Sequence, residues 1–264
     1  MVSTAPLVGL TKPLQKPLRE VGGFMALALD TFVQAARAPF FWRECLEQCW
    51  FVARVATFPA IMQSIAFNGM VVFLFGVAAV SFGAGDINGA GSGLATVSQI
   101  GPVTTVFVLS GAAATAMCAD LGARTIREEI DAMKVLGIDP VHRLVVPRVA
   151  ALLITGNLIN GVVIISGLCA DYAFTIYALN GNPGAFAASV TLLTNLPVVV
   201  VSFVKASIFG MLAGLIACYK GLSAGGGPQG VGNAVNETVV YTFMALLIAN
   251  VIISIITATT TLVT

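Results

Sequence analysis

The sequence predicts an all-α integral membrane protein with an N-terminal cytoplasmic interfacial helix, five transmembrane helices and a cytoplasmic helix between spans two and three. Three observations predict this class. Of the 264 residues, 58% are hydrophobic and 9% are charged, whereas a soluble domain has about 25% charged residues. Five apolar runs are near or above the roughly 20 residues that cross a bilayer core. Basic residues are confined to alternate connections. The low fraction of charged residues excludes a soluble enzyme, a secreted domain and a disordered chain.

The five spans follow from long apolar runs with almost no charge. Only Asp171 in the third span and Lys205 in the fourth are charged. Gly210 and Gly214 form a GxxxG pair in the fourth span, which predicts close helix packing there. The predicted spans are residues 58–82, 100–119, 149–179, 196–219 and 239–263.

The distribution of Lys and Arg orients the chain. Connections 83–99 and 180–195 contain no Lys or Arg, and Lys205 lies within a span. Because Lys and Arg accumulate in cytoplasmic loops, we expect a plasma-membrane protein with a cytoplasmic N-terminus and an outside C-terminus. The basic residues on the cytoplasmic side are Lys12, Lys16, Arg19, Arg37, Arg43, Arg54, Arg124, Arg127, Lys134, Arg143, Arg148 and Lys220.

The first 57 residues are expected to stay on the cytoplasmic side. Residues 1–21 form a tail without the long apolar run of a cleavable signal peptide. Residues 22–57 are expected to form the interfacial helix, because apolar residues such as Cys45 and Val52 recur at helical spacing among charged ones. The alternative is a sixth, poor span beginning near Gly22, which would move the N-terminal basic residues outside.

The most informative polar segment is residues 119–148, between spans two and three. Its charged middle predicts an amphipathic cytoplasmic helix over residues 123–138, ended by Gly137 and followed by a turn at Asp139-Pro140. Such a helix is either a solvated loop helix or one that docks into a groove on a partner. Its apolar positions are Ile126, Ile130, Met133 and Leu136.

This segment carries a resemblance. Glu128–Pro140, EEIDAMKVLGIDP, followed by RLVVPR at Arg143–Arg148, resembles the signature of the MlaE/YrbE permease family. These permeases are the membrane subunits of ABC transporters that move lipids together with MCE-domain proteins. The resemblance covers nearly the whole chain from about residue 22. The sequence of residues 119–140 is most similar to that of the actinobacterial YrbE subunits of Mce systems; it reads ADLGARTIREEIDAMKVLGIDP.

The resemblance implies a function and a set of partners. The cytoplasmic helix would be a coupling helix that sits on a separate ABC ATPase dimer, which binds ATP and Mg. A second YrbE-type permease would complete a heterodimer, MCE-domain proteins would lie outside, and lipid import would be the activity. The chain itself lacks a GxxxxGK[ST] phosphate loop, and we expect no catalytic residue, cofactor, metal or nucleic acid. The ATPase-coupling residues are Glu128, Glu129, Asp131, Met133, Lys134, Gly137 and Asp139.

Polar residues inside the spans are candidates for a substrate cavity, because burying them in lipid is costly. These candidates are Gln63, Ser64, Asn68 and Lys205. Helix-to-helix hydrogen bonds are the alternative for the three residues of span one, and a structural ion pair is the alternative for Lys205. Asp171 is either the partner of Lys205 or an interfacial residue beside Tyr172, and the second placement is favoured.

Two other functions remain open. Lys205 and Asp171 could form the titrating pair of an ion-gradient-driven secondary transporter, or the chain could be a structural membrane anchor for an envelope complex. Secondary transporters often contain inverted repeats, but no internal repeat is visible and five spans do not divide into two halves. The lipid transporter is therefore the preferred interpretation.

Overall fold

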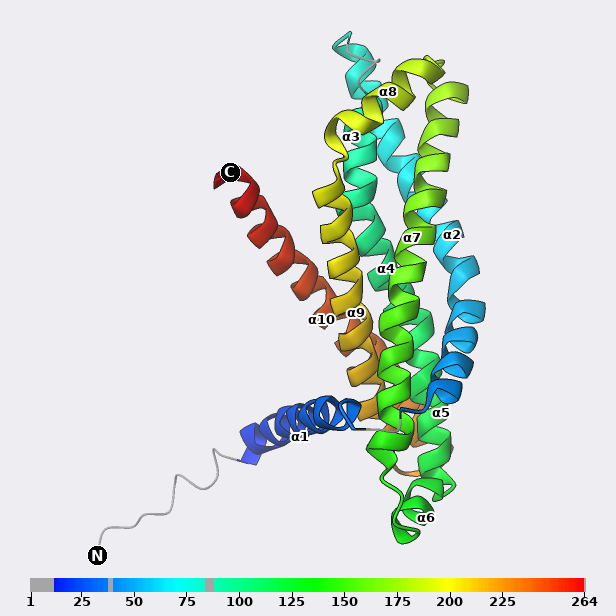
Figure 1. Ribbon diagram of the computed structural model, residues 1–264, viewed down its shortest axis with the longest axis vertical. Helices are drawn as coiled ribbons and strands as arrows, with labels where there is room; N and C mark the ends of the chain where they lie inside the picture. The colour runs from blue at the N-terminus through cyan, green and yellow to red at the C-terminus, as the bar shows by residue number, and fades with distance from the viewer. Residues whose placement is uncertain (1–11, 38–39, 84–87, 264) are drawn as a thin grey trace, which may run out of the picture.

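The computed structural model describes residues 12–37, 40–83 and 88–263, and these form an all-α bundle (Figure 1). Five of its helical segments are long and apolar enough to cross a membrane, which confirms the predicted fold class. The part of the expected tail before Lys12 lies outside the described residues. The spanning segments are Trp42–Ala79, Asn88–Ile126, Val141–Tyr177, Leu196–Leu222 and Gly227–Thr259.

The bundle has two different ends. Helices α1 (Lys12–Ala35) and α6 (Glu129–Val135) lie at one end (Figure 1). We call it the basic end because the exposed side chains of Arg127 and Lys134 belong to α6 and the turn before it. The opposite end carries α8 (Pro183–Leu193) packed on α3 (Asn88–Ala95). The remaining elements are α2 (Trp42–Ser81), η2 (Thr96–Ile100), α4 (Gly101–Val108), η3 (Leu109–Ala113), α5 (Ala114–Ile126), η4 (Val141–Val145), α7 (Val146–Tyr177), α9 (Leu196–Leu222) and α10 (Gly227–Val263).

The expected interfacial helix over residues 22–57 is wrong in its bounds. Helix α1 ends at Ala35 and lies across the basic end, whereas residues 42–57 are the first four turns of α2. The physical reason is a stripe of buried side chains that continues without a break into the apolar run and packs in one core with α7. That stripe is Cys45, Val52, Ala56 and Ala60.

The length of α2 explains the charges in its first turns. Its 40 residues extend for about 60 Å at 1.5 Å per residue, roughly twice the hydrocarbon thickness of a bilayer. The helix is therefore longer than one crossing of the hydrocarbon requires. Arg43 and Glu47, which form an exposed ion pair at 3.1 Å, lie in the half at the basic end.

The second span and its neighbours are also more helical than predicted. Helical residues begin at Asn88, well before the expected start at residue 100, and include the two π-helical turns η2 and η3. The expected connection 180–195 contains α8, whose N-terminus is capped by the Asn182 side chain accepting from the Gly184 N–H at 2.9 Å. The hydropathy pattern did not predict these segments as helices. Small and polar residues form helices when they pack against a neighbouring helix.

The glycine pair of the fourth span packs within the chain. Gly210 and Gly214 on α9 face α7, and a Cβ at Gly214 would lie 3.0 Å from the Cα of Val149. A Cβ at Gly210 would meet the Leu152 carbonyl and would lie 2.9 Å from the Cα of Leu153. The close packing predicted from GxxxG is confirmed, with α7 as the partner.

We expect Gly210→Ala to destabilise the protein. The added methyl group would meet backbone atoms that no rotamer change can move, so α9 must shift, at a cost of about 1–3 kcal/mol. Thermal unfolding of the purified protein in detergent measures the effect. Gly232→Ala on α10 is the control, because no atom lies within 4 Å of its Cβ position. Equal melting temperatures for the two variants would contradict the packing described here.

Candidate coupling site

The segment between α5 and α7, residues 127–145, protrudes from the basic end (Figure 1). The expected single helix over residues 123–138 is wrong, because the helix is interrupted at Glu128. This residue has a left-handed φ of 60°, and its N–H donates to the Thr125 carbonyl at 3.1 Å, which closes α5. A left-handed conformation is costly for a residue with a Cβ. The interruption turns α6 away from the axis of α5.

Gly137 ends α6 as the sequence predicts. Its φ is +74°, the Ile138 N–H donates to the Met133 carbonyl at 2.9 Å, and the Gly137 N–H donates to the Lys134 carbonyl at 3.0 Å. This pair of bonds is a Schellman motif, which favours glycine. The Asp139 carboxylate then accepts from the Val141 N–H at 2.9 Å, so the predicted turn at Asp139-Pro140 is confirmed.

The apolar residues of the segment divide into two groups. Ile130 is buried and Met133 is half-buried, and both pack on a core that includes Leu144. By contrast, large apolar side chains around the end of α6 are exposed. We call these three residues the apolar tip: Val135 at 88%, Leu136 at 74% and Ile138 at 44% exposure.

The apolar tip was missed by the sequence interpretation, which placed Leu136 on the same face as Ile130 and Met133. Its signal in the sequence is three large apolar residues around Gly137, directly after a charged run. Single exposed apolar residues are ordinary. A group of three at the end of a protruding helix is typical of a docking surface.

Most charged side chains of the segment are already paired. Arg127 lies 3.1 Å from Glu129, and Lys134 lies 2.8 Å from Asp131. These pairs are exposed and therefore weak. Asp139 accepts from the Gln34 side chain of α1 at 2.6 Å. The Glu128 carboxylate, in contrast, has no ion pair among the described residues.

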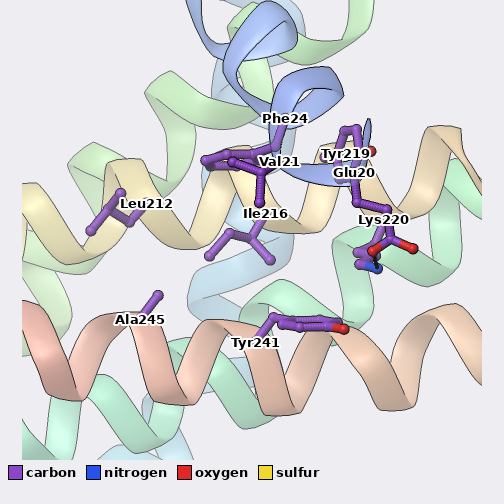
Figure 2. Close-up of a pocket in the computed structure, with 9 residues that line it drawn as sticks. All are labelled: Glu20, Val21, Phe24, Leu212, Ile216, Tyr219, Lys220, Tyr241 and Ala245. Carbon is purple, nitrogen blue, oxygen red and sulfur yellow. Dashed lines mark hydrogen bonds and ion pairs between the residues drawn. The ribbon is translucent and has the colours of Figure 1, made fainter. Parts of the chain in front are cut away.

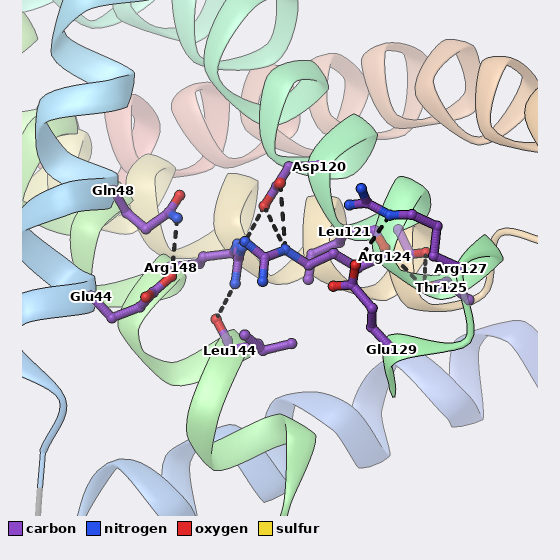
Figure 3. Close-up of polar contacts among 11 residues, drawn as sticks. Glu44, Gln48, Asp120, Leu121, Arg124, Thr125, Arg127, Glu129, Leu144 and Arg148 are labelled. Atoms are coloured by element: carbon purple, nitrogen blue, oxygen red, sulfur yellow. Dashed lines mark hydrogen bonds and ion pairs between the residues drawn. The ribbon is translucent and has the colours of Figure 1, made fainter. Parts of the chain in front are cut away.

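An ion pair between a fully buried arginine and a partly exposed aspartate joins the two ends of the segment (Figure 3). The Arg148 side chain at the start of α7 is fully buried, and its Nη2 donates to Asp120 Oδ2 on α5. Its Nη1 donates to the Leu144 carbonyl at 3.1 Å, and Arg124 lies 3.4 Å from the same Asp120. Asp120 and Arg148 therefore join α5 to α7 where the segment between these helices begins and ends.

The Asp120–Arg148 pair was also missed by the sequence interpretation. Its signal is an acid and a base at the basic ends of consecutive spans, on either side of the polar segment. Further contacts connect the segment to the α1–α2 connection: the His142 ring lies 5.3 Å from the Phe41 ring, and Arg143 lies 4.2 Å above Phe41. Residues 127–145 therefore contact α1 and the α1–α2 connection as well as the two helices that they join.

Comparison with known proteins agrees with this arrangement. A family model described as Permease MlaE matches residues 45–256. The chain belongs to the MlaE permease family. A probable ABC transporter permease of Rickettsia typhi is 28% identical, covering 96% of this chain and 97% of the relative. A probable ABC transporter permease of Synechocystis is 32% identical, covering 80% and 81%.

A relative that matches a smaller part of the chain comes from a plant. The chloroplastic protein named trigalactosyldiacylglycerol 1 of Arabidopsis thaliana is 29% identical, covering 61% of this chain and 46% of the relative. Together with the five spanning segments, the family match makes this chain a multi-pass ABC transporter permease.

The substrate-cavity candidates in the first span of this MlaE permease form hydrogen bonds between helices. Ser64 and Asn68 on α2 are fully buried. The Ser64 hydroxyl donates to the Val163 carbonyl of α7 at 2.8 Å, and Asn68 Oδ1 lies 2.6 Å from the Thr96 hydroxyl of η2. These are the helix-to-helix hydrogen bonds that the sequence left as an alternative. Gln63 is half-buried, and a cavity role for these residues stays a prediction.

Lys205 and Asp171 of this MlaE permease lie in separate hydrogen-bonded groups. Lys205 is 2% exposed and donates to the Ser98 carbonyl at 3.1 Å and to the Ser254 hydroxyl of α10 at 2.8 Å. Asp171 is fully buried and accepts from the Thr96 hydroxyl at 2.6 Å. Among the described residues the two form no ion pair. The interfacial placement of Asp171 is wrong, because its side chain faces η2 inside the bundle.

Proposed function

We propose that this permease is the membrane subunit of an ATP-driven lipid transporter, and that the apolar tip docks into a separate ABC ATPase. The observation that carries the proposal is the exposed Val135-Leu136 pair on a segment whose two ends are joined by Asp120 and Arg148. Short helices with an apolar face and a charged rim fit hydrophobic grooves on partner proteins. Glu128 supplies a carboxylate for a basic residue on that partner.

The mechanism follows from these contacts. Closure of the ATPase dimer on ATP and Mg would move the coupling segment, and the Asp120–Arg148 pair would transmit the motion to α5 and α7 together. Helix α7 packs on both α2 and α9, so the motion would reach the helices that carry Ser64, Asn68 and Lys205. ATP hydrolysis would thus open and close a cavity in which Gln63, Ser64, Asn68 and Lys205 are candidates to contact the substrate.

A lipid substrate is supported by two facts. The Arabidopsis relative is named after a diacylglycerol lipid. Acyl chains also suit an apolar bundle, since burial of each CH₂ contributes about 0.8 kcal/mol.

The concentration of Lys and Arg at the basic end supports a cytoplasmic basic end, an outside C-terminus and a location in the plasma membrane.

The partners follow from the same proposal. Exposed apolar residues along α10, among them Met244, Ile248 and Ile255, support a second permease against this helix. The similarity of residues 119–140 to actinobacterial YrbE subunits supports an Mce-type importer with a heterodimer of permeases and MCE-domain proteins outside. Catalysis of ATP hydrolysis would belong to the ATPase subunit alone.

Co-purification from the native membrane tests the proposal. The tagged chain is purified in mild detergent, and the eluate is examined by proteomics and for ATPase activity. We expect an ABC ATPase, a second permease and MCE-domain proteins, with the ATPase lost in Glu128→Lys/Glu129→Lys. Glu47→Lys is the control, since this exposed carboxylate lies on α2. A chain that elutes alone or as a simple homodimer, under conditions that preserve other ABC complexes, would refute the proposal.

A further inference from the structure

An amphipathic cavity lies beneath α1 at the basic end, between α9 and α10 (Figure 2). Its apolar chamber has a volume of about 240 Å³ and is lined by Val21 and Phe24 of α1 and by Leu212, Ile216 and Ala245 of the two spanning helices. A polar chamber of about 270 Å³ adjoins it and includes Asn233 and Glu237. The two chambers share Glu20, Tyr219 and Lys220, so together they form one site with an apolar and a polar half.

Charged groups are gathered where the two chambers meet. Lys220 Nζ lies 2.8 Å from Glu237 Oε2, 3.4 Å from Glu20 Oε2 and 4.5 Å from the centre of the Tyr241 ring. The Lys220 side chain is 12% exposed, whereas those of Glu20 and Glu237 are 58% and 54% exposed. The two carboxylates therefore face solvent, and they exceed the lysine by one negative charge.

The cavity is oriented along the spanning helices. Leu212 precedes Lys220 by two turns of α9, about 12 Å at 1.5 Å per residue, so the apolar chamber extends from the basic end toward the middle of the bundle. Helix α1 covers this site at Gly23, where a Cβ would lie 2.9 Å from the Tyr219 hydroxyl oxygen. The Phe24 ring packs edge-on to Tyr219 at 5.9 Å.

We propose that this cavity binds a phospholipid with a primary ammonium headgroup, such as phosphatidylethanolamine, from the leaflet at the basic end. An acyl chain would fill the apolar chamber between Leu212, Ile216 and Ala245. The headgroup ammonium would donate to Glu20 and Glu237, and the phosphate would accept from Lys220, whose Nζ has a third donor beyond the two carboxylates. An anionic headgroup without an ammonium is disfavoured, because it would meet two carboxylates and one lysine.

The lipid in this site is a bound component of the permease, separate from the transport path proposed above. It would connect α1 to α9 and α10, whereas Ser64 and Asn68 do not line this cavity and bond to α7 and η2. Retention of this lipid needs neither ATP nor an ATPase. Different measurements therefore test the bound lipid and the proposed transport function.

Lipid retention by the full chain tests the inference. The purified chain is placed in nanodiscs of equal parts phosphatidylethanolamine and phosphatidylglycerol, extracted into mild detergent, and examined by native mass spectrometry. We expect phosphatidylethanolamine to be retained about tenfold over phosphatidylglycerol. Ala245→Trp fills the apolar chamber and should lower retention about tenfold. Ile165→Trp places the same ring on the exposed face of α7 and should leave retention unchanged.

A second variant tests the headgroup and does not depend on the packing of a large ring. Glu20→Gln/Glu237→Gln removes two exposed carboxylates, so the fold should be kept and the preference should move toward phosphatidylglycerol. Retention of phosphatidylglycerol as strong as that of phosphatidylethanolamine in the unaltered chain would overturn the inference. So would equal retention by Ala245→Trp and Ile165→Trp, or an unchanged preference in the Gln variant.

Discussion

Val135→Asp/Leu136→Asp is expected to abolish binding of the ATPase while leaving the permease folded. Both side chains are largely exposed, at 88% and 74%, so their replacement removes no packing within the chain. Apolar residues at the centre of an interface each contribute about 2 kcal/mol or more, and a charge placed in an apolar groove adds a desolvation cost. We therefore expect affinity for the purified ATPase to fall by more than about a hundredfold.

The measurement is a titration of the reconstituted permease with its ATPase, together with thermal unfolding of the permease alone. Ala132→Asp is the control for charge, and it is compared with Leu136→Asp alone as well as with the double variant. It adds one carboxylate, as Leu136→Asp does, at another exposed position of α6. If Ala132→Asp weakens binding as much as the double variant does, charge alone accounts for the loss and the apolar tip is not the docking surface.

Asp120→Ala is expected to be among the most destabilising single changes in the chain. It leaves the fully buried Arg148 guanidinium without its carboxylate, and removal of one partner of a buried pair costs about 3–5 kcal/mol. Arg148→Met should cost less, because Asp120 is 35% exposed and retains Arg124 at 3.4 Å. Unfolding of the purified variants by heat or denaturant shows which of the two substitutions lowers the stability more.

The double variant Asp120→Leu/Arg148→Met separates stability from coupling. Replacement of a buried pair by apolar residues of similar volume is often neutral, so this variant should recover most of the stability lost in Asp120→Ala. It should still bind the ATPase through the apolar tip but fail to link ATP hydrolysis to movement of α5 and α7. A larger loss of stability for Arg148→Met than for Asp120→Ala would contradict this account of the pair.

Features that depend on local composition were predictable. Five spans follow from hydropathy, because a helix satisfies the backbone groups of a continuous apolar run within the run itself. The end of α6 at Gly137 and the turn at Asp139-Pro140 follow from backbone preferences within a few residues. The GxxxG motif at Gly210 and Gly214 predicted close helix packing, but it did not predict that α7 is the helix packed there.

Helix bounds were less predictable where packing decides them. Residues 42–57 carry enough charge to look interfacial, yet Cys45, Val52 and Ala56 pack in the same core as α7 and continue α2. Helix α8 is short and lies in a connection that hydropathy cannot separate from a loop. In both cases the deciding energy comes from a neighbour distant in sequence.

The sequence alone determined the class of this protein, its spans, the asymmetry of its charges and its resemblance to MlaE permeases, because each depends on composition or on a contiguous motif. Only the tertiary structure decided that α6 is separated from α5 at Glu128 and that Val135 and Leu136 are exposed while Ile130 is buried. It also decided that Arg148 pairs with Asp120 and that Lys205 and Asp171 do not pair. These outcomes depend on which helix faces lie against one another, and that arrangement is set by the packing of the whole bundle.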